Sequence, residues 1–202
     1  MQTRAALADA ALRLAAERGL DQITVEEISE AADVSSRTFF NYFGSKDEAI
    51  TDAHLAHDAE IRAILATLLP DLPVLAAIRL SLNFAIAQIE RDRAQWLLRL
   101  RVIEANAGLL ATLVASGAAA ERETAGVIAD RLGLPRDDAY PQLIVAVASA
   151  AFRCAMVRWA RGDGQQTLSA LVDEAFSGVA AGLPNPENAT HKPVRPSSKD
   201  RA

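Results

Sequence analysis

The segment ITVEEISEAADVSSRTFFNYFGSKDEAI, residues 23 to 50, contains signals for three helix starts in one short stretch. Thr24 and Glu27 have the spacing of a capping box, in which each side chain bonds the backbone of the other residue. Ser35 is the next residue of N-cap type, and Ser45 begins a second capping box. Since each cap fixes where a helix begins, this segment determines how the N-terminal part of the chain is divided.

The helices between these caps are short. A first helix of about residues 3 to 18 ends before Gly19, a residue type typical of helix C-caps. Two further helices are expected at about 24 to 32 and 36 to 43, connected only by Asp33 and Val34 before the N-cap residue Ser35. Two short helices joined by a tight turn form the outline of a helix-turn-helix, whose second helix lies in the major groove of DNA.

The rest of the chain also has helical periodicity, and no run of alternating β-branched residues bounded by turns indicates a strand. We therefore predict an all-α fold of about nine helices. The six that follow the helix-turn-helix are expected at about 46 to 69, 73 to 90, 94 to 105, 107 to 132, 138 to 161 and 165 to 182.

These helices divide into two predicted domains. Residues 1–48 form a three-helix DNA-binding domain, and residues 49–182 form a larger ligand-binding and dimerisation domain. Residues 183–202 carry four of the eight prolines, which predicts a disordered tail. The helix at 138 to 161 is apolar on almost all sides. This predicts burial within its domain and, with the helix at 165 to 182, against a second subunit.

The charge distribution restricts DNA binding to a local surface. The formal net charge is -5, and the first fifty residues contain five basic and nine acidic residues. From Val34 to Lys46, however, there are two basic residues and no acidic one. Hydroxyl, amide and cationic side chains are the types that read base edges or hold phosphates. The predicted DNA-binding residues are Thr24, Ser35, Ser36, Arg37, Thr38, Asn41, Tyr42 and Lys46.

Four of the ten aromatic residues lie in the same segment. We expect Phe39 and Phe43, four residues apart, to anchor the second helix of the motif on the helices before it. Phe40 and Tyr42 are expected at the sides, within reach of the sugar-phosphate backbone. Lys46 begins the next helix, where its ammonium and the free amides of that N-terminus can together hold a phosphate.

The span from Thr3 to Ile50 resembles the DNA-binding domain of the tetracycline-repressor (TetR) family of bacterial transcription regulators. The resemblance implies a nine-helix homodimer whose recognition helices contact a palindromic operator and whose C-terminal domain binds a small ligand. Phe40 and Tyr42 stand where many members have Tyr and then His, so the usual tyrosine hydroxyl contact to phosphate is absent at Phe40. Asp33 stands where the family often has Gly, and Asp tolerates the left-handed conformation of such a turn.

Residues 94 to 182 are similar to the branch of the family described as binding acyl-CoA-like ligands. A mostly apolar helical interior with a few cationic and amide side chains independently suits an amphipathic ligand with an anionic end. We therefore predict a repressor released by a small amphipathic or hydrophobic effector, with acyl-CoA-like molecules as candidates. The predicted ligand-binding residues are Asn83, Trp96, Arg99, Ile103, Phe152 and Arg153. The alternative for each arginine is a surface or interface position, and for each tryptophan it is plain packing.

Other classes of site find little support in the sequence. His54 and His57 have the spacing of two metal ligands, but no third ligand is evident, so no metal site is predicted. The single cysteine, Cys154, excludes a disulfide framework and is expected to pack in the core. The chain has no paired nucleophile and base and no phosphate loop. We therefore predict no enzyme, no catalytic residues and no cofactor.

The sequence also bears on location. No signal peptide is evident, and the longest apolar run, residues 143 to 152, is about half the length that spans a bilayer. We expect a cytoplasmic protein with no membrane partner. Two alternatives stay open: a helical interaction protein that has lost DNA binding, which the acidic first fifty residues favour, and an enzyme that uses the helical pocket.

Overall fold

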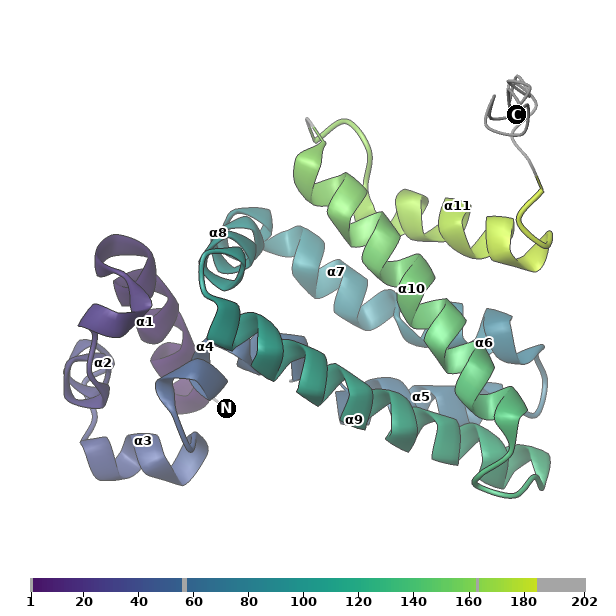
Figure 1. The fold of residues 1–202 in the computed structure, drawn as a ribbon, viewed down its shortest axis with the longest axis horizontal. Helices are drawn as coiled ribbons and strands as arrows, with labels where there is room; N and C mark the ends of the chain where they lie inside the picture. The colour runs from purple at the N-terminus through teal and green to yellow at the C-terminus, as the bar shows by residue number, and fades with distance from the viewer. Residues whose placement is uncertain (1, 56–57, 163, 185–202) are drawn as a thin grey trace, which may run out of the picture.

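The computed structural model describes residues 2–55, 58–162 and 164–184, and regular structure in this part of the chain is entirely helical (Figure 1). The all-α prediction is therefore confirmed. Most of the predicted disordered tail, from residue 185, lies outside the described residues. The helices are α1 (Gln2–Arg18), η1 (Leu20–Gln22), α2 (Val25–Ala31), α3 (Ser36–Tyr42), α4 (Lys46–Leu55), α5 (Asp58–Leu68), α6 (Val74–Ser81), α7 (Asn83–Arg91), α8 (Arg93–Glu104), α9 (Ala107–Leu132), α10 (Ala139–Arg161) and α11 (Leu168–Ala180).

Two of the nine expected helices are each found as a pair of shorter helices. The helix expected at 46 to 69 is found as α4 and α5, on either side of residues 56–57, which are not among the described residues. The helix expected at 73 to 90 is divided at Leu82 into α6 and α7. The buried hydroxyl of Ser81 donates to the carbonyl of Ile78 over 2.8 Å. Such a bond competes with the backbone hydrogen bonds and bends helices.

The first three helices have the boundaries that their caps predict. Oγ1 of Thr24 accepts from the N–H of Glu27 over 3.2 Å, and the Glu27 carboxylate accepts from the N–H of Thr24 over 2.9 Å. Ser35 caps α3 by accepting from the N–H of Thr38. Between α2 and α3, Asp33 has a φ of 54°, the left-handed conformation that Asp tolerates better than most residues. The predicted helix-turn-helix is confirmed.

A first hydrophobic core holds together α1–α4, which we call the N-terminal unit. Phe39 and Phe43 are buried in this core with ring centroids 5.7 Å apart, as predicted for the anchors of α3. The core also contains Val102 and Ile103 of α8 and Leu109 of α9. The chain bends by 109° between α8 and α9. The corner formed by this bend packs into the N-terminal unit and joins it to the rest of the molecule.

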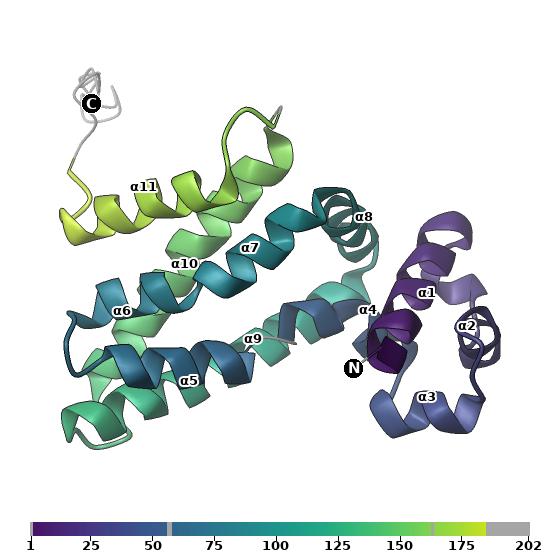
Figure 2. The same ribbon diagram turned by 180° about the vertical axis from the view of Figure 1, so that it is seen from behind.

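The helices α5–α11, which we call the C-terminal unit, surround a second core. In Figure 1, α10 crosses the C-terminal half of α9, and the view from behind in Figure 2 shows α5, α6 and α7 on the opposite side. The helices α1 to α3 lie together at one end of the molecule, beyond α8 (Figure 1). The two domain bounds expected from the sequence stay predictions, because α4, α8 and α9 all pack between the units.

Polar bridges between helices far apart in the sequence close the C-terminal unit. Nε of Arg79 in α6 donates to Asp173 in α11 over 2.7 Å. The N–H of Ser169, at the start of α11, donates to the carboxylate of Glu90 in α7 over 2.9 Å. These contacts hold α11 on α6 and α7 and so complete the cover over the second core.

The helix α10 has one buried side and one exposed side. Trp159 of α10 and Trp96 of α8 are both buried in the second core, which confirms core packing for both tryptophans. Leu143 and Val157 are 64% and 48% exposed, so the predicted burial within the domain holds for one side of α10, and burial of the other side against a second subunit stays a prediction. The prediction that Cys154 packs in the core is wrong. Its position three residues before Val157 puts it on the exposed side of the helix.

Candidate nucleic-acid interface

The hydroxyls at the start of α3 also hold the helix together. Oγ of Ser35 accepts from the N–H of Thr38 over 3.1 Å and lies 2.9 Å from Oγ1 of Thr38. Ser36, the first residue of α3, is half-buried beside them. A hydroxyl has one donor and two acceptor sites. Ser35 and Thr38 therefore keep capacity for a base or a phosphate while they stabilise the first turn.

Arg37 and Asn41 are exposed side chains of α3. Their spacing of four residues places them on one face of the helix. A guanidinium can bind two acceptors of guanine, and a carboxamide can bind the donor and acceptor of adenine. Since α3 carries no acidic residue, this face has the chemistry for reading base edges in a major groove.

Thr24 and Lys46, at the starts of α2 and α4, are engaged within the fold. The hydroxyl of Thr24 belongs to the capping box of α2. Nζ of Lys46 donates to the carbonyl of Leu20 over 2.8 Å and to that of Ile23 over 3.0 Å. The ammonium thus fixes the connection between α1 and α2, and its third N–H is the one that a phosphate could accept. A direct DNA contact by either residue stays a prediction.

Arg4 near the start of α1 adds a cation that the sequence pattern does not reveal. Its guanidinium donates to the carbonyl of Tyr42 over 3.2 Å and lies 4.6 Å from the ring centroid of Phe43. The contact ties α1 to the end of α3, beside the exposed ring of Tyr42. No local signal predicts it, because the two residues are 38 positions apart.

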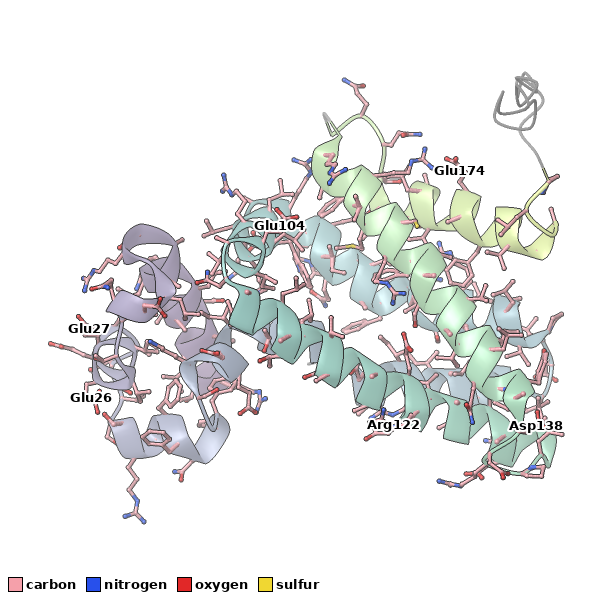
Figure 3. All side chains as sticks on the ribbon, viewed as in Figure 1. Glu26, Glu27, Glu104, Arg122, Asp138 and Glu174 are labelled. Carbon is pink, nitrogen blue, oxygen red and sulfur yellow. The ribbon has the colours of Figure 1, made fainter. Side chains whose placement is uncertain are left out.

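Acidic side chains lie on the α2 side of this surface. Glu26, Glu30 and Asp33 line an open cleft of about 490 Å³ next to the turn. Figure 3 shows Glu26 and Glu27 on α2, at the end of the molecule away from the C-terminal unit. The backbone N–H of Thr24 holds the pKa of Glu27 below its ordinary value. Ser35 and Ser36 line the same cleft. Because carboxylates repel phosphates, DNA is expected to approach the exposed side of α3 that carries Arg37 and Asn41.

The polar members of the predicted ligand-binding set lie apart from one another. Asn83 is exposed and accepts a hydrogen bond from Arg79 over 2.6 Å. Arg153 is exposed and lies 3.5 Å from Glu121. Phe152 is partly buried against the second core. The structure does not bring these side chains together at one site, and their role in ligand binding stays a prediction.

Trp96, Arg99 and Ile103 follow one face of α8 and span the two cores. Trp96 packs in the second core and Ile103 in the first. Arg99 lies between them and is 2% exposed, and its Nε donates to the carbonyl of Ile50 in α4 over 3.1 Å. Its guanidinium also lies 5.5 Å from the ring centroid of Trp96. Arg99 therefore connects α8 to α4, a contact that its sequence context does not signal.

A second open cleft, of about 620 Å³, lies between the two units. Gln95 of α8 donates to the carboxylate of Asp9 of α1, and both residues line this cleft. The other lining residues are Ala6, Ala10, Leu12, Arg13, Ala31, Ala32, Ala94, Leu98 and Arg101. None of the six predicted ligand-binding residues is among them. The sequence did not predict this cleft because α8 is distant in the chain from α1 and α2, which form its other wall.

Metal binding and membrane spanning are two further possibilities for the described part of the chain. No group of three His, Cys, Asp or Glu residues there could hold a metal ion, and the side chains of His54 and His57 fall outside it. The helix α10 is long and apolar enough to cross a membrane, as is the bent pair of α8 and α9. Both α9 and α10 contribute buried residues to the second core.

Comparison with known protein families matches both units. Residues 7–50 match the family described as bacterial regulatory proteins, tetR family. Residues 72–184 match the family described as MftR C-terminal domain. The first match contains α2, α3 and the turn between them, and the second extends from the start of α6 to the end of α11.

Individual relatives are similar over most of the chain. TcmR of Streptomyces glaucescens, an HTH-type transcriptional regulator, is 34% identical over 165 residues, which cover 78% of this chain and 73% of that protein. MftR of Mycobacterium tuberculosis, described as a regulator of mycofactocin biosynthesis, is 27% identical over 177 residues. The alignment covers 88% of this chain and 89% of that protein. The solved structure of Thermus thermophilus FadR, a TetR-family repressor in complex with lauroyl-CoA, has a TM-score of 0.54 at 22% identity. That alignment covers 94% of this chain and 100% of FadR, and at this identity the likeness concerns the fold.

Proposed function

The chain belongs to the TetR family of bacterial regulatory proteins, and we propose that it is a homodimeric repressor released from a palindromic operator by a small amphipathic effector. The observation that carries this proposal is the capped helix α3, which exposes Arg37 and Asn41 on an acid-free face. We expect such a regulator to act in the cytoplasm and to catalyse no reaction.

An apolar stripe on α10 supports the homodimer. Its six residues follow at alternating spacings of three and four, which is the heptad pattern of a helix–helix seam. The residues are Tyr140, Leu143, Val147, Ala150, Cys154 and Val157, of which Val147 is partly buried and the others are exposed. Since α11 packs beside α10, two copies related by a two-fold axis can form a four-helix interface. A contiguous exposed stripe of this kind is typical of a protein interface.

The two-fold axis determines how the dimer meets DNA. Each protomer contributes one copy of α3, and the two copies must reach successive major-groove faces of the duplex. Half-sites about 34–36 Å apart, or a multiple of that distance, satisfy this requirement. A change of a few ångström in the distance between the two copies of α3 therefore weakens binding to the operator.

The effector class follows from the C-terminal unit and its relatives. The second core is apolar and helical, which suits a ligand with a hydrophobic body. FadR, which shares the fold, binds lauroyl-CoA in its solved structure. We therefore propose an amphipathic effector with an acyl chain and an anionic end as the first class to test.

Arg99 supports a route by which the effector acts on α3. Its bond to the Ile50 carbonyl connects α8, a helix of the C-terminal unit, to α4. Gln95 of α8 makes a second connection, to Asp9 of α1. A ligand that moves α8 would therefore move α1 and α4, and with them α3. Because coupling is reciprocal, operator DNA must weaken effector binding by the same factor.

Fluorescence anisotropy tests the proposed function directly. Purified protein is titrated against DNA from upstream of its own gene and against a scrambled duplex, at two salt concentrations. We expect tighter binding to the upstream DNA, with affinity falling as salt rises because phosphate contacts release counterions. Addition of lauroyl-CoA is expected to weaken the specific complex, and effector affinity that is equal with and without operator would contradict the coupling.

A pair of arginine variants discriminates the regulator from an interaction protein that has lost DNA binding. Arg37→Ala removes a cation from α3, and Arg122→Ala removes an exposed cation from α9, far from α3 (Figure 3). Arg37→Ala should weaken operator binding by about 1–3 kcal/mol, as expected for a base contact. Arg122→Ala should bind as the parent protein does. An interaction protein would bind no duplex specifically, with or without Arg37, whereas specific binding that is equal in both variants would mean that Arg37 contacts no base.

A further inference from the structure

Phe40 is an exposed aromatic ring in a defined orientation on α3. Its exposed fraction is 59%, whereas the adjacent Phe39 is fully buried. The two rings meet edge to face, with centroids 5.5 Å apart and an interplanar angle of 85°. Such pairs are favourable beyond their buried area. The buried ring of Phe39 therefore helps to hold the exposed ring in place.

The ring lies on the face of α3 that carries the candidate base-reading side chains. Phe40 follows Arg37 by three residues and Ser36 by four, which are the spacings of neighbours on a helix surface. Asn41, four residues after Arg37, flanks the same face. When Arg37 faces the major groove, the neighbouring ring of Phe40 is within reach of the base edges as well as of the sugar-phosphate backbone.

The chemistry of the ring limits what it can contact there. A phenyl ring has no hydroxyl, so it can neither donate to a phosphate nor bond a base edge. The apolar group that the major groove presents is the C5 methyl of thymine, and Phe is among the side chains that contact it. Burial of that methyl against the ring would favour thymine over cytosine at one position of each half-site.

We propose that Phe40 is a specificity-determining residue that packs on the C5 methyl of one thymine in each operator half-site. This inference rests on the proposed function, because it requires α3 to enter the major groove. The competing contact is with deoxyribose, which is equally apolar in every sequence. The two contacts differ in one respect: a sugar contact would strengthen binding to all DNA alike, whereas a methyl contact depends on the base.

Replacing thymine by deoxyuridine tests the proposal, since this change removes the methyl and leaves the hydrogen-bonding edge intact. The full-length protein first selects a preferred duplex from a random pool. Each thymine is then replaced in turn, symmetrically in both half-sites, and anisotropy gives the affinities of the parent protein and of Phe40→Ala. At one position we expect the parent to lose about fourfold per half-site, the value of one buried methyl group. Phe40→Ala should show no loss at that position.

Two control variants make the result specific. Phe40→Leu keeps an apolar side chain and should keep part of the methyl effect. Tyr42→Ala removes the neighbouring exposed ring of α3 and should leave the effect unchanged. Circular dichroism checks that each variant keeps its helices.

Three outcomes would overturn the proposal. The parent and Phe40→Ala could lose equal affinity at every replaced thymine, or the selected half-sites could contain no thymine. Phe40→Ala could also weaken selected and scrambled duplexes by one factor, which identifies a sugar contact. In all three cases the parent still selects DNA, so the proposed function stands. If the parent protein selects no duplex at all, the proposed function is contradicted, and the proposed thymine contact of Phe40 is contradicted with it.

Discussion

The N-terminal unit is organised by contacts close in the sequence, whereas the C-terminal unit is closed by contacts far apart in it. The capping box of α2 joins Thr24 to Glu27, three residues away. The bridge that holds α11 on α6 joins Arg79 to Asp173, 94 residues away. The candidate DNA-binding surface is therefore built chiefly from local signals, whereas the C-terminal unit depends on how distant helices pack.

The junction between the units also depends on contacts far apart in the sequence. The corner of α8 and α9 packs in the N-terminal core although it lies some fifty residues beyond α4 in the chain. Arg99 bonds the main chain of α4 from this corner. Substitutions in the two units and at the junction should therefore have separable effects, which the following predictions use.

The largest effect is expected from Phe39→Ala, which empties the N-terminal core. The buried ring is worth about 3–5 kcal/mol of unfolding free energy. DNA binding should be lost while the proposed dimer through α10 persists, as judged by anisotropy and size-exclusion chromatography. Phe40→Ala is the matched control, because its ring is exposed and loses only the edge-to-face contact with Phe39, worth about 0.5–1.5 kcal/mol, so its urea midpoint should fall much less. Loss of the dimer in Phe39→Ala would show that the units do not respond separately.

A charged residue in the apolar stripe of α10 is expected to dissociate the proposed dimer. Leu143→Glu places a carboxylate at a position that the proposed interface buries. The cost of about 3 kcal/mol raises the dissociation constant roughly a hundredfold. Sedimentation should then show monomers at concentrations where the parent is dimeric. Gln142→Glu adds the same charge beside the stripe, and an equal shift in both variants would place the interface elsewhere.

Arg99→Met should weaken the junction by an intermediate amount. The change removes a charged donor from the Ile50 carbonyl and keeps the length of the side chain. Hydrogen bonds to charged groups contribute about 1.5–3 kcal/mol. Arg101→Met, at an exposed position of the same helix, should stay within about 0.5 kcal/mol of the parent. Urea unfolding measures both, and equal midpoints would contradict the structural role of Arg99.

Thr24→Ala should cost about 1 kcal/mol, the usual value of an N-cap. The variant removes the acceptor for the N–H of Glu27 and so loosens the start of α2. Thr24→Ser keeps the hydroxyl and is expected to keep most of the stability. Thermal unfolding of the three proteins decides the matter, and an undisturbed melting temperature in Thr24→Ala would mean that the cap is dispensable.

The smallest effect concerns the pH dependence of the same cap. The pKa of Glu27 is lowered chiefly because its carboxylate accepts from the N–H of Thr24. A carboxylate whose pKa is lower in the folded state stabilises the protein above its unfolded pKa, and this stabilisation disappears as pH falls through the folded pKa. The difference in melting temperature between the parent and Glu27→Gln should therefore be largest near neutral pH and shrink in acid. A difference in melting temperature that is constant with pH would contradict this role of the Glu27 carboxylate.

Much of the N-terminal unit could be predicted from the sequence. Thr24, Ser35 and the buried positions of Phe39 and Phe43 follow from capping chemistry and helical spacing alone. The contact of Arg4 with the end of α3 could not be predicted, because no local pattern joins two residues 38 positions apart.

The C-terminal unit was predicted only in outline. The helix bounds of α9 and α10 followed from periodicity, but the break at Leu82 depended on a hydroxyl of Ser81 that bonds back to its own helix. The six residues expected to form one ligand site are distributed over the surface, the second core and the junction. Burial of an apolar helix also depends on its neighbours, and for this reason Cys154 was placed on the wrong side.

The sequence by itself determined where helices begin, that they form a helix-turn-helix, and which side chains α3 carries, because caps and helical period act over three or four residues. Only the tertiary structure decided which side of α10 stays exposed and that Arg99 bonds the main chain of α4. It also decided that the α8–α9 corner lies in the N-terminal core. Those outcomes depend on the relative positions of helices that are distant in the chain. Packing between such helices selects among many arrangements that the same apolar pattern allows.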